Sequence, residues 1–436
     1  MSKLNGIHLP HRKNTADMPA VGITPPKSVT IPLAMHIGAP AKPVVKVGDE
    51  VRIGDLIGEA DGFVSAPVHA SISGKVTAVA PIWATNGSSV TAVTIESDGL
   101  MQVSEKVAPP EVSDFDSFIA AVRNSGAVGL GGAGFPTAVK LAVKDLSAIE
   151  EVIINGAECE PYITSDTRTM IDDAESVKEG IELLGKYLGV KRFIIGIEEN
   201  KKSAIAEMQK LEGDGISVKV LPSIYPQGGE KVLIYNCTGK IVPEGKLPID
   251  VGSIVINVTT LAFIAKYIKT GMPLTEKVLT VDGGAVKEPK NLIVPVGTSL
   301  EAVFEFCGGF KSEPAKVLYG GPMMGLAVKS LSSPVLKNNN AVLAFSEDEA
   351  HLPEPTACIR CGKCVRACPF NLMPLDFARG YALRDYDLLE KRRVNLCMEC
   401  GCCSFVCPAH RPLVENNKLA KAALRKHLDK QKGEAK

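Results

Sequence analysis

The sequence predicts a multidomain protein of mixed α/β and α+β class. Short apolar runs separated by glycines fill the first hundred residues, strand-like and helical segments alternate in the centre, and the C-terminal end is rich in cysteine. The length of 436 residues supports several domains, because chains beyond about 250–300 residues usually divide. We expect four units, at residues 1–108, 109–270, 271–336 and 337–436.

Composition and charge argue against several classes of protein. Apolar residues make up 45% of the chain, and the formal net charge is zero. A neutral chain has no general attraction to nucleic acid, so we expect no nucleic-acid partner. Residues 1–17 lack the apolar core of a signal peptide, and the longest apolar stretch, 254–268, is shorter than the roughly 20 residues that span a bilayer. We therefore expect a soluble or peripheral protein without a transmembrane segment.

Residues 29–98 contain two blocks of short β runs joined by glycine turns. Such blocks are typical of the two halves of a β-sandwich with tight hairpins. They resemble the barrel-sandwich hybrid of biotinyl and lipoyl domains, in which a lysine at a hairpin tip carries the prosthetic group. Gly62 stands at that tip here, so we interpret the N-terminal domain as a scaffold without an acceptor lysine.

A proline-containing linker, 108–110, ends this block, and a helix follows. Its apolar residues recur with the helical period from Phe115 to Val122, and we expect Ser113 and Asp116 to form a capping box. Beyond residue 127, amphipathic helices alternate with strand-like runs at 152–154, 193–197, 218–221 and 253–258. This alternation predicts an α/β domain with a largely parallel sheet.

Residues 273–330 return to β runs and glycines, with one short helix expected around 300–307. This pattern fits a small α+β module. A loop follows at 337–340, and a helical cysteine-rich end comes after it. The tail, 416–436, is basic and helix-prone but has no aromatic residue that would fix it at a membrane.

Eight cysteines in the last quarter form two runs with the same spacing, C-x2-C-x2-C-x3-C-P. This spacing is typical of ferredoxins with two [4Fe–4S] clusters, in which the fourth cysteine of each run binds the other cluster. Zinc sites usually use two cysteine pairs that lie well apart, so the repeated run favours iron–sulfur. One predicted cluster takes Cys358, Cys361, Cys364 and Cys407, and the other takes Cys368, Cys397, Cys400 and Cys403.

Four cysteines lie outside this pattern. Cys402 is next to a predicted ligand, and we expect it to pack near a cluster, with an exchange of roles with Cys403 as the alternative. Cys159, Cys237 and Cys307 stand alone and are expected to be small buried residues.

A glycine loop in the centre of the chain has two interpretations. Gly129, Gly131 and Gly134 fit the pattern G-x-G-x-x-G, although a helix precedes the loop where a dinucleotide-binding motif has a strand. Glycines let backbone N–H groups approach a phosphate, and Pro136 suits the first turn of a helix that would carry Lys140. A tight turn that allows close helix packing explains the same residues.

The loop and three later segments resemble the FMN- and NADH-binding flavoprotein subunit of respiratory complex I. The matching runs are 129–140, the acidic run 155–161, the pair at 229–230 and the turn at 257–260. The resemblance implies a central Rossmann-like FMN domain, with hydride exchange at the flavin and no catalytic side chain. The cofactor-binding residues that it implies are Gly129, Gly131, Gly132, Gly134, Phe135, Lys140, Asn155, Glu158, Glu160, Gly229, Glu230, Asn257 and Thr260.

A wider resemblance covers nearly the whole chain. Segments 6–11, 31–40, 64–70, 225–230 and 320–325 are similar to those of the C subunit of Rnf complexes, which are membrane-bound, ion-pumping ferredoxin:NAD oxidoreductases. This resemblance implies an SLBB β-grasp module near 273–330 and a C-terminal helical, ferredoxin-like domain. It also implies two [4Fe–4S] clusters and FMN as cofactors, with NAD(H) as substrate.

The same resemblance implies a function and partners. The chain would move electrons between the two clusters, FMN and NAD(H) at the cytoplasmic side of the cell membrane. Its partners would be the membrane and iron–sulfur subunits of the complex, and ferredoxin through one of them. Two alternatives are a related reductase, serving cobalamin or an amino-acid reductase, and a non-enzymatic adaptor with a degenerate flavin loop.

Overall fold

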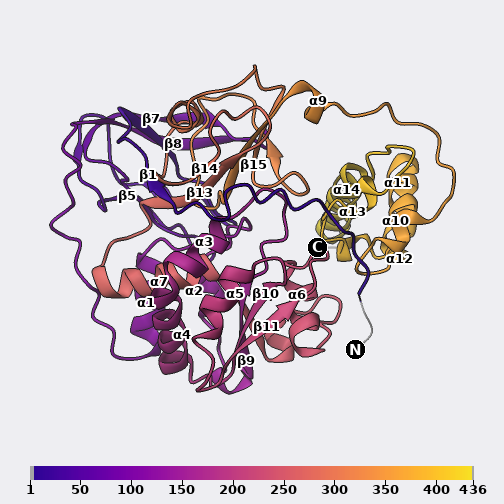
Figure 1. Ribbon diagram of the computed structural model, residues 1–436, viewed down its shortest axis with the longest axis horizontal. Helices are drawn as coiled ribbons and strands as arrows, with labels where there is room; N and C mark the ends of the chain where they lie inside the picture. Colours follow the sequence, from indigo (N-terminus) through magenta and orange to yellow (C-terminus); the bar gives the residue numbers. More distant parts are fainter. Residues whose placement is uncertain (1–3, 435–436) are drawn as a thin grey trace.

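The computed structural model describes residues 4–434. Figure 1 shows a β-rich region built from both N-terminal strands and later strands, an α/β region beside it, and a separate helical lobe at the C-terminal end. A long segment links α9 (Glu347–Ala350) to the lobe, and residues 351–360 of this segment are exposed.

Two small antiparallel sheets form the N-terminal domain, as the β blocks predict. The four-stranded sheet has the order β2 (Ser28–Pro32), β8 (Ser89–Ser97), β7 (Gly74–Trp83) and β4 (Glu50–Val51). The three-stranded sheet has the order β3 (Lys42–Pro43), β5 (Leu56–Glu59) and β6 (Val68–His69). Buried aliphatic residues from both sheets, including Ile31, Ile57 and Ile95, form one core.

The central domain begins with α1 (Phe115–Asn124). The predicted capping box is one residue out of register: Asp114, not Ser113, is the N-cap, and it exchanges hydrogen bonds with Ser117, not Asp116. Of the predicted apolar stripe, Phe118 and Val122 are buried, and Phe115 and Ile119 are half-buried.

Four parallel strands form the sheet of this domain, in the order β11 (Ile216–Leu221), β10 (Phe193–Glu198), β9 (Glu151–Gly156) and β12 (Ser253–Asn257). In chain order this is 3-2-1-4, which is the Rossmann arrangement with a switch point between β9 and β12. Ligands of such sheets bind at the carboxyl ends of the strands beside the switch point.

Helices cover both faces of the parallel sheet. They are α2 (Thr137–Leu141), α3 (Ser165–Asp172), α4 (Ala174–Leu188), α5 (Lys202–Gln209), α6 (Glu230–Thr238) and α7 (Val258–Thr270), with 3-10 turns at Leu146–Ala148 and Pro248–Val251. A large apolar core lies between the sheet and α4 and α7.

The third domain is a six-stranded mixed sheet packed on α8 (Leu300–Phe306). Its order is β1 (Val21–Gly22), β14 (Lys290–Pro295), β13 (Glu276–Asp282), β17 (Ala341–Phe345), β15 (Lys316–Tyr319) and β16 (Leu326–Ala327). The expected boundary at residue 336 precedes β17, so the sheet extends beyond it.

The helical lobe contains α10 (Lys363–Arg366), α11 (Pro374–Leu383), α12 (Tyr386–Lys391), a 3-10 turn (Val394–Leu396), α13 (Cys402–Phe405) and α14 (Leu413–Glu434). Apolar residues of α14, including Leu424, pack on Phe377 of α11. Within residues 4–434, no helix is both long and apolar enough to cross a membrane.

Candidate functional site

The glycine loop folds as a closed turn between α1 and α2. The Gly129 N–H donates to the Phe135 carbonyl at 2.9 Å, and the Gly134 N–H donates to the Gly129 carbonyl at 3.1 Å. Gly131 and Gly132 are exposed. Within the described part of the chain, the N–H groups of Gly131, Gly132 and Ala133 have no acceptor. The loop therefore presents free donors to solvent.

The loop lies at the switch point of the parallel sheet. A Cβ atom on Gly131 would lie 2.8 Å from Nδ2 of Asn257, the last residue of β12. The Leu130 N–H donates to Oγ1 of Thr260 at 2.9 Å, and the Thr260 N–H donates to Oδ1 of Asn257 at 3.1 Å. The structure thus brings the predicted residues Asn257 and Thr260 into contact with the glycine loop.

These residues fit a phosphate. Free backbone N–H groups on glycines are the donors that phosphate-binding loops use. A side chain at Gly131 would collide with Asn257, so the close approach of the two segments requires glycine there. Thr137, which begins α2, is buried, and its hydroxyl has no partner among the described residues.

The acidic run follows β9 and turns one carboxylate toward α3. Glu158 has a left-handed backbone (φ +46°), and its carboxylate accepts from the Asp166 N–H at 2.6 Å and from Oγ1 of Thr167 at 2.5 Å. Burial raises the pKa of Glu158 to about 7, with Asp166 adding to the rise and Lys13 opposing it. In this structure the carboxylate is used to cap a helix.

The second acidic side chain contacts the third domain. Glu160 accepts from the N–H groups of Met323 at 3.0 Å and Met324 at 2.8 Å. Burial raises its pKa to about 7, while these two N–H groups oppose the rise. The predicted place of both glutamates beside a nicotinamide stays a prediction.

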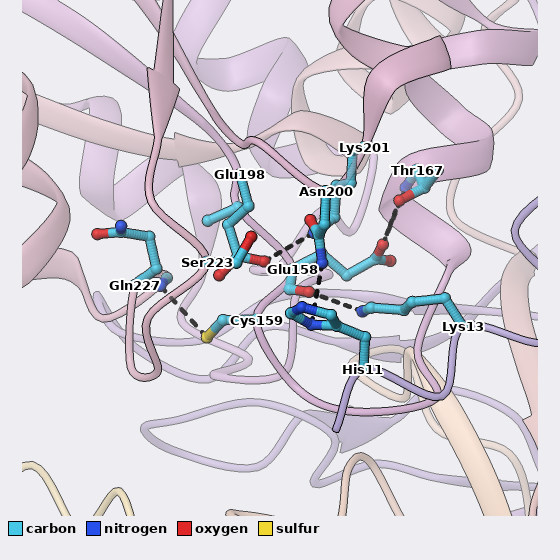
Figure 2. A network of polar contacts seen from close by, with 12 residues as sticks. His11, Lys13, Glu158, Cys159, Thr167, Glu198, Asn200, Lys201, Ser223 and Gln227 are labelled. Atoms are coloured by element: carbon cyan, nitrogen blue, oxygen red, sulfur yellow. Dashed lines mark hydrogen bonds and ion pairs between the residues drawn. The ribbon is translucent and has the colours of Figure 1, made fainter. Parts of the chain in front are cut away.

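A half-buried lysine that the sequence did not single out, Lys13, holds the acidic run in place. Figure 2 shows Lys13 reaching from the N-terminal segment toward Glu158. Its ammonium group donates to the carbonyls of Glu158 and Glu160, both at 2.8 Å, and to that of Ile163 at 2.5 Å. Nothing in the polar N-terminal sequence distinguishes this lysine from a solvated one.

The remaining predicted flavin residues form two further contacts. Lys140 pairs with Glu230 at 2.8 Å and donates to the Val255 carbonyl at 3.0 Å. Asn155, near the end of β9, donates to the Gly228 carbonyl at 3.0 Å, next to Gly229. These groups lie near the carboxyl ends of β9 and β12, and Phe135 is half-buried at the end of the glycine loop. Their part in binding a flavin stays a prediction.

A cavity in the helical lobe is lined by the four cysteines predicted for one cluster. They are Cys368, Cys397, Cys400 and Cys403, and the lining also includes Cys402 and apolar residues such as Phe370, Leu372 and Phe377. Asn417 of α14 donates to the sulfurs of Cys397 at 3.6 Å and Cys403 at 3.8 Å. Thiols around a cavity lined mainly by apolar residues, with N–H donors directed at them, fit a [4Fe–4S] cluster.

The two cysteine runs share one backbone conformation. Left-handed residues recur 39 positions apart: Arg360 with Glu399, Gly362 with Gly401, and Asn371 with His410. The other predicted set is nearer the surface, since Cys358 is exposed, and Cys364 and Cys407 pack together beside Cys403. The inner set thus lies around one cavity, and two members of the outer set, Cys364 and Cys407, pack together. The crossed assignment of the ligands stays a prediction.

The inner cysteine loop touches the α/β domain. The Tyr225 hydroxyl donates to the Cys400 carbonyl at 2.8 Å, and a Cβ on Gly229 would lie 2.3 Å from the terminal methyl carbon of Met398. Cys402 is buried at this contact, with its sulfur 3.9 Å from the Tyr225 carbonyl. The loop that carries three cluster ligands thus abuts the predicted flavin-binding pair at 229–230.

The isolated cysteines are only partly as expected. Cys237 and Cys307 are buried in apolar cores, but Cys159 is half-buried and accepts a hydrogen bond from the Gly228 N–H at 3.3 Å. Burial raises the pKa of the Cys159 thiol to about 12, with Glu198 adding to the rise. This shift favours the neutral thiol over the reactive thiolate near neutral pH.

Comparison with known families matches each predicted unit. Models described as "RnfC Barrel sandwich hybrid domain", "Nuo51 FMN-binding domain", "SLBB domain" and "4Fe-4S dicluster domain" match residues 2–100, 122–266, 278–327 and 357–410. The fold class predicted from the sequence is confirmed by these matches.

Several relatives match over most of their length. The C subunit of a Na⁺-translocating ferredoxin:NAD⁺ oxidoreductase complex from Acetobacterium woodii is 44% identical over 422 residues, covering 95% of both chains. The C subunit of a proton-translocating complex from Clostridium ljungdahlii is 43% identical, covering 83% of this chain and 80% of that one. The C subunit of an ion-translocating oxidoreductase complex from Rhodobacter capsulatus is 38% identical, covering 96% and 82%.

One solved structure bears on the fold alone. A chain of an NAD⁺-reducing [NiFe]-hydrogenase, in the air-oxidized state, superposes with a TM-score of 0.50 at 18% identity. The match covers 71% of this chain and 63% of that chain.

Proposed function

Since this chain belongs to the C-subunit family of ion-translocating ferredoxin:NAD⁺ oxidoreductase complexes, we propose that it carries electrons between NAD(H) and the other subunits of such a complex. It is an electron-transfer subunit with an FMN-binding domain and a domain for two [4Fe–4S] clusters. The observation that carries the proposal is the contact of the cysteine loop with Tyr225 and Gly229.

Bound FMN supplies the exchange of a hydride with NAD(H) and of single electrons with iron–sulfur clusters. The free N–H groups of the 129–134 loop would hold its phosphate, with Asn257 and Thr260 fixing the loop from below. Lys140 and Glu230 would lie near the flavin as a pair of opposite charge. The acidic run would face the nicotinamide from the end of β9.

We assign different places to the two clusters. The set Cys368, Cys397, Cys400 and Cys403 is the inner site, because its loop touches the α/β domain. The set Cys358, Cys361, Cys364 and Cys407 is the outer site, because Cys358 is exposed. Electrons would cross between the lobe and the α/β domain at the inner site and enter or leave the chain at the outer site.

The proposal includes partners and a place in the cell. Other subunits of the complex would bind this chain at the cytoplasmic side of the membrane, and ferredoxin would act through one of them. Ion movement would belong to those subunits. The names of the relatives differ in the coupling ion, so the present chain is not assigned to Na⁺ or H⁺.

Anaerobic purification followed by iron, sulfide and flavin quantification tests the proposal. We expect about eight irons and eight sulfides per chain, as two [4Fe–4S] clusters require, and about one FMN. Titration with NADH should bleach the flavin and then the clusters. Zinc in place of iron would contradict the cluster assignment, and flavin that NADH fails to bleach would favour the adaptor. The match over nearly the full chain favours this family over a cobalamin or amino-acid reductase partner.

A further inference from the structure

Two side chains from outside the α/β domain bind carbonyl groups of the glycine loop. Lys277 lies on β13 of the third domain, and its Nζ donates to the Leu130 carbonyl at 2.9 Å. Asn338 lies in the loop before β17, and its Nδ2 donates to the Gly132 carbonyl at 2.9 Å. The third domain thus contacts the loop at two alternate peptide groups.

These contacts determine where two N–H groups point. A trans peptide is planar, so its C=O and N–H bonds point in opposite directions. Because Lys277 holds the Leu130 carbonyl, the N–H of Gly131 is turned away from Lys277. Because Asn338 holds the Gly132 carbonyl, the N–H of Ala133 is turned away from Asn338. Both N–H groups belong to the set that has no acceptor within residues 4–434.

The burial of Lys277 shows that this contact is costly. The residue is 2% exposed, and the one hydrogen bond of its ammonium group among the described residues is to the Leu130 carbonyl. Burial lowers the pKa of Lys277 to about 8, and Asp166 opposes this shift. A buried ammonium group is destabilising unless its charge and donors are used.

We propose that Lys277 and Asn338 are positioning residues for the phosphate of the flavin. They fix two carbonyls of the glycine loop so that the N–H groups of Gly131 and Ala133 face the phosphate. Without these contacts, the two peptides of a glycine-rich loop can rotate and present carbonyl oxygens to the anion. The inference rests on the proposed function, since it deepens the role of the same loop.

The test compares FMN with riboflavin, which has the same ring system but no phosphate. Full-length protein is depleted of flavin under anaerobic conditions, and the Kd of each ligand is measured by fluorescence. Lys277→Met and Asn338→Leu should each weaken FMN binding about tenfold, because one loop N–H group no longer donates to the charged phosphate. Riboflavin binding should be unchanged. Asn338→Leu removes no charge. A weaker binding of FMN by this variant therefore reports the orientation of the loop and not a lost electrostatic attraction.

Lys337→Met is the matched control. Lys337 is also a buried lysine that donates only to carbonyls among the described residues, those of Pro67 at 2.6 Å and Gly126 at 2.8 Å, and it does not touch residues 129–134. It should leave the ratio of the two Kd values at the wild-type level.

The possible outcomes are distinct. Equal weakening of FMN and riboflavin would mean that both residues only maintain the fold, and it would overturn the inference. If both variants keep the wild-type Kd values for FMN and riboflavin, the inference is overturned, while the proposed flavin site still holds. Wild-type protein that binds both ligands equally would instead contradict the phosphate contact in the proposed function. Cluster absorbance serves as the check that each variant folds. If Lys277→Met loses this absorbance, the inference is judged on Asn338→Leu, because Asn338 is only half-buried.

Discussion

The hydroxyl of Tyr225 donates a hydrogen bond of 2.8 Å to the carbonyl of Cys400 and so joins the α/β domain to a cluster-binding loop. The chain enters the lobe from the third domain through the exposed segment 351–360, which itself imposes little order. The lobe is held by a small set of side-chain contacts, including Met398 on Gly229 and the ion pair of Arg393 with Glu244 at 3.5 Å. If the chain works as proposed, electron transfer between the lobe and the α/β domain depends on these contacts.

Tyr225→Phe should slow the reduction of the clusters by NADH several-fold. The substitution removes one buried hydrogen bond, worth about 1 kcal/mol, and leaves the Cys400 carbonyl without its partner. Anaerobic stopped-flow absorbance measures the rate, and iron and flavin contents should stay at wild-type values.

Tyr319→Phe is the matched control for this substitution. Tyr319 also donates from a buried hydroxyl to a carbonyl, that of Pro334 at 2.6 Å, but it lies inside the third domain. It should lower stability by a similar amount and leave the rate unchanged. If the two variants slow the reaction equally, the Tyr225 contact has no special part in docking.

The elements with a strong local pattern could be predicted from the sequence. Three of the parallel strands are short, almost continuous buried apolar runs. The helix that buries Val177 and Leu184 follows the helical period, and the cysteines repeat one fixed spacing. The glycine loop could be recognised because close approach of a backbone to an anion requires residues without side chains.

The supporting residues could not be predicted. Lys277 and Lys337 are buried and Lys13 is half-buried, each with its ammonium group on carbonyl groups. Only the packing of segments far apart in the chain produces these contacts. The observed capping box lies one residue from the predicted position. Asp114 and Ser113 are both good caps, and the path of the chain into α1 decides between them. Such choices depend on long-range contacts.

The crossed assignment of the fourth cysteines predicts which cluster each substitution removes. Cys368→Ala should abolish the inner cluster, because Cys368 lines the cavity with Cys397, Cys400 and Cys403. Cys407→Ala should abolish the outer cluster. In each case the iron content should fall by about half, and EPR of the dithionite-reduced protein should show one signal in place of two interacting ones.

Cys402→Ala provides the control for the cysteine series. Its thiol is directed at the Tyr225 carbonyl, so both clusters should remain. Loss of a cluster in this variant would show that Cys402, and not Cys403, is the ligand. A crossed result, with Cys368→Ala losing the outer cluster, would contradict the ligand sets.

Gly131→Ala should weaken FMN binding about tenfold. The added methyl would lie 2.8 Å from Nδ2 of Asn257, and the displaced amide would lose its hydrogen bonds to Thr260 and to Asp166. Gly129→Ala is the comparison in the same loop, because its Cβ would have no neighbour closer than 3.5 Å. The Kd for FMN should change less in Gly129→Ala. An equal loss would show that the loop tolerates no side chain at either position.

Glu160→Gln should change the pH dependence of stability. Burial raises the pKa of Glu160 from 4.5 to about 7, so the folded protein takes up this proton at higher pH than the unfolded chain does. The stabilising contribution of this group is complete below about pH 4.5 and is lost as the pH rises through about 7. The neutral amide lacks this titration.

The melting temperature of Glu160→Gln relative to wild type should therefore be more favourable at about pH 8.5 than at about pH 6, because only the wild type then carries a buried charge. Differential scanning fluorimetry under anaerobic conditions measures both values. The comparison between variants cancels the titration of Glu158, which shifts in the same direction, and of the buried lysines, which shift in the opposite one. For Glu354→Gln, on the exposed segment, the difference in melting temperature from wild type should be the same at both pH values. If Glu160→Gln behaves like Glu354→Gln, the Glu160 carboxylate is ionised in the fold throughout this range, held by the Met323 and Met324 N–H groups.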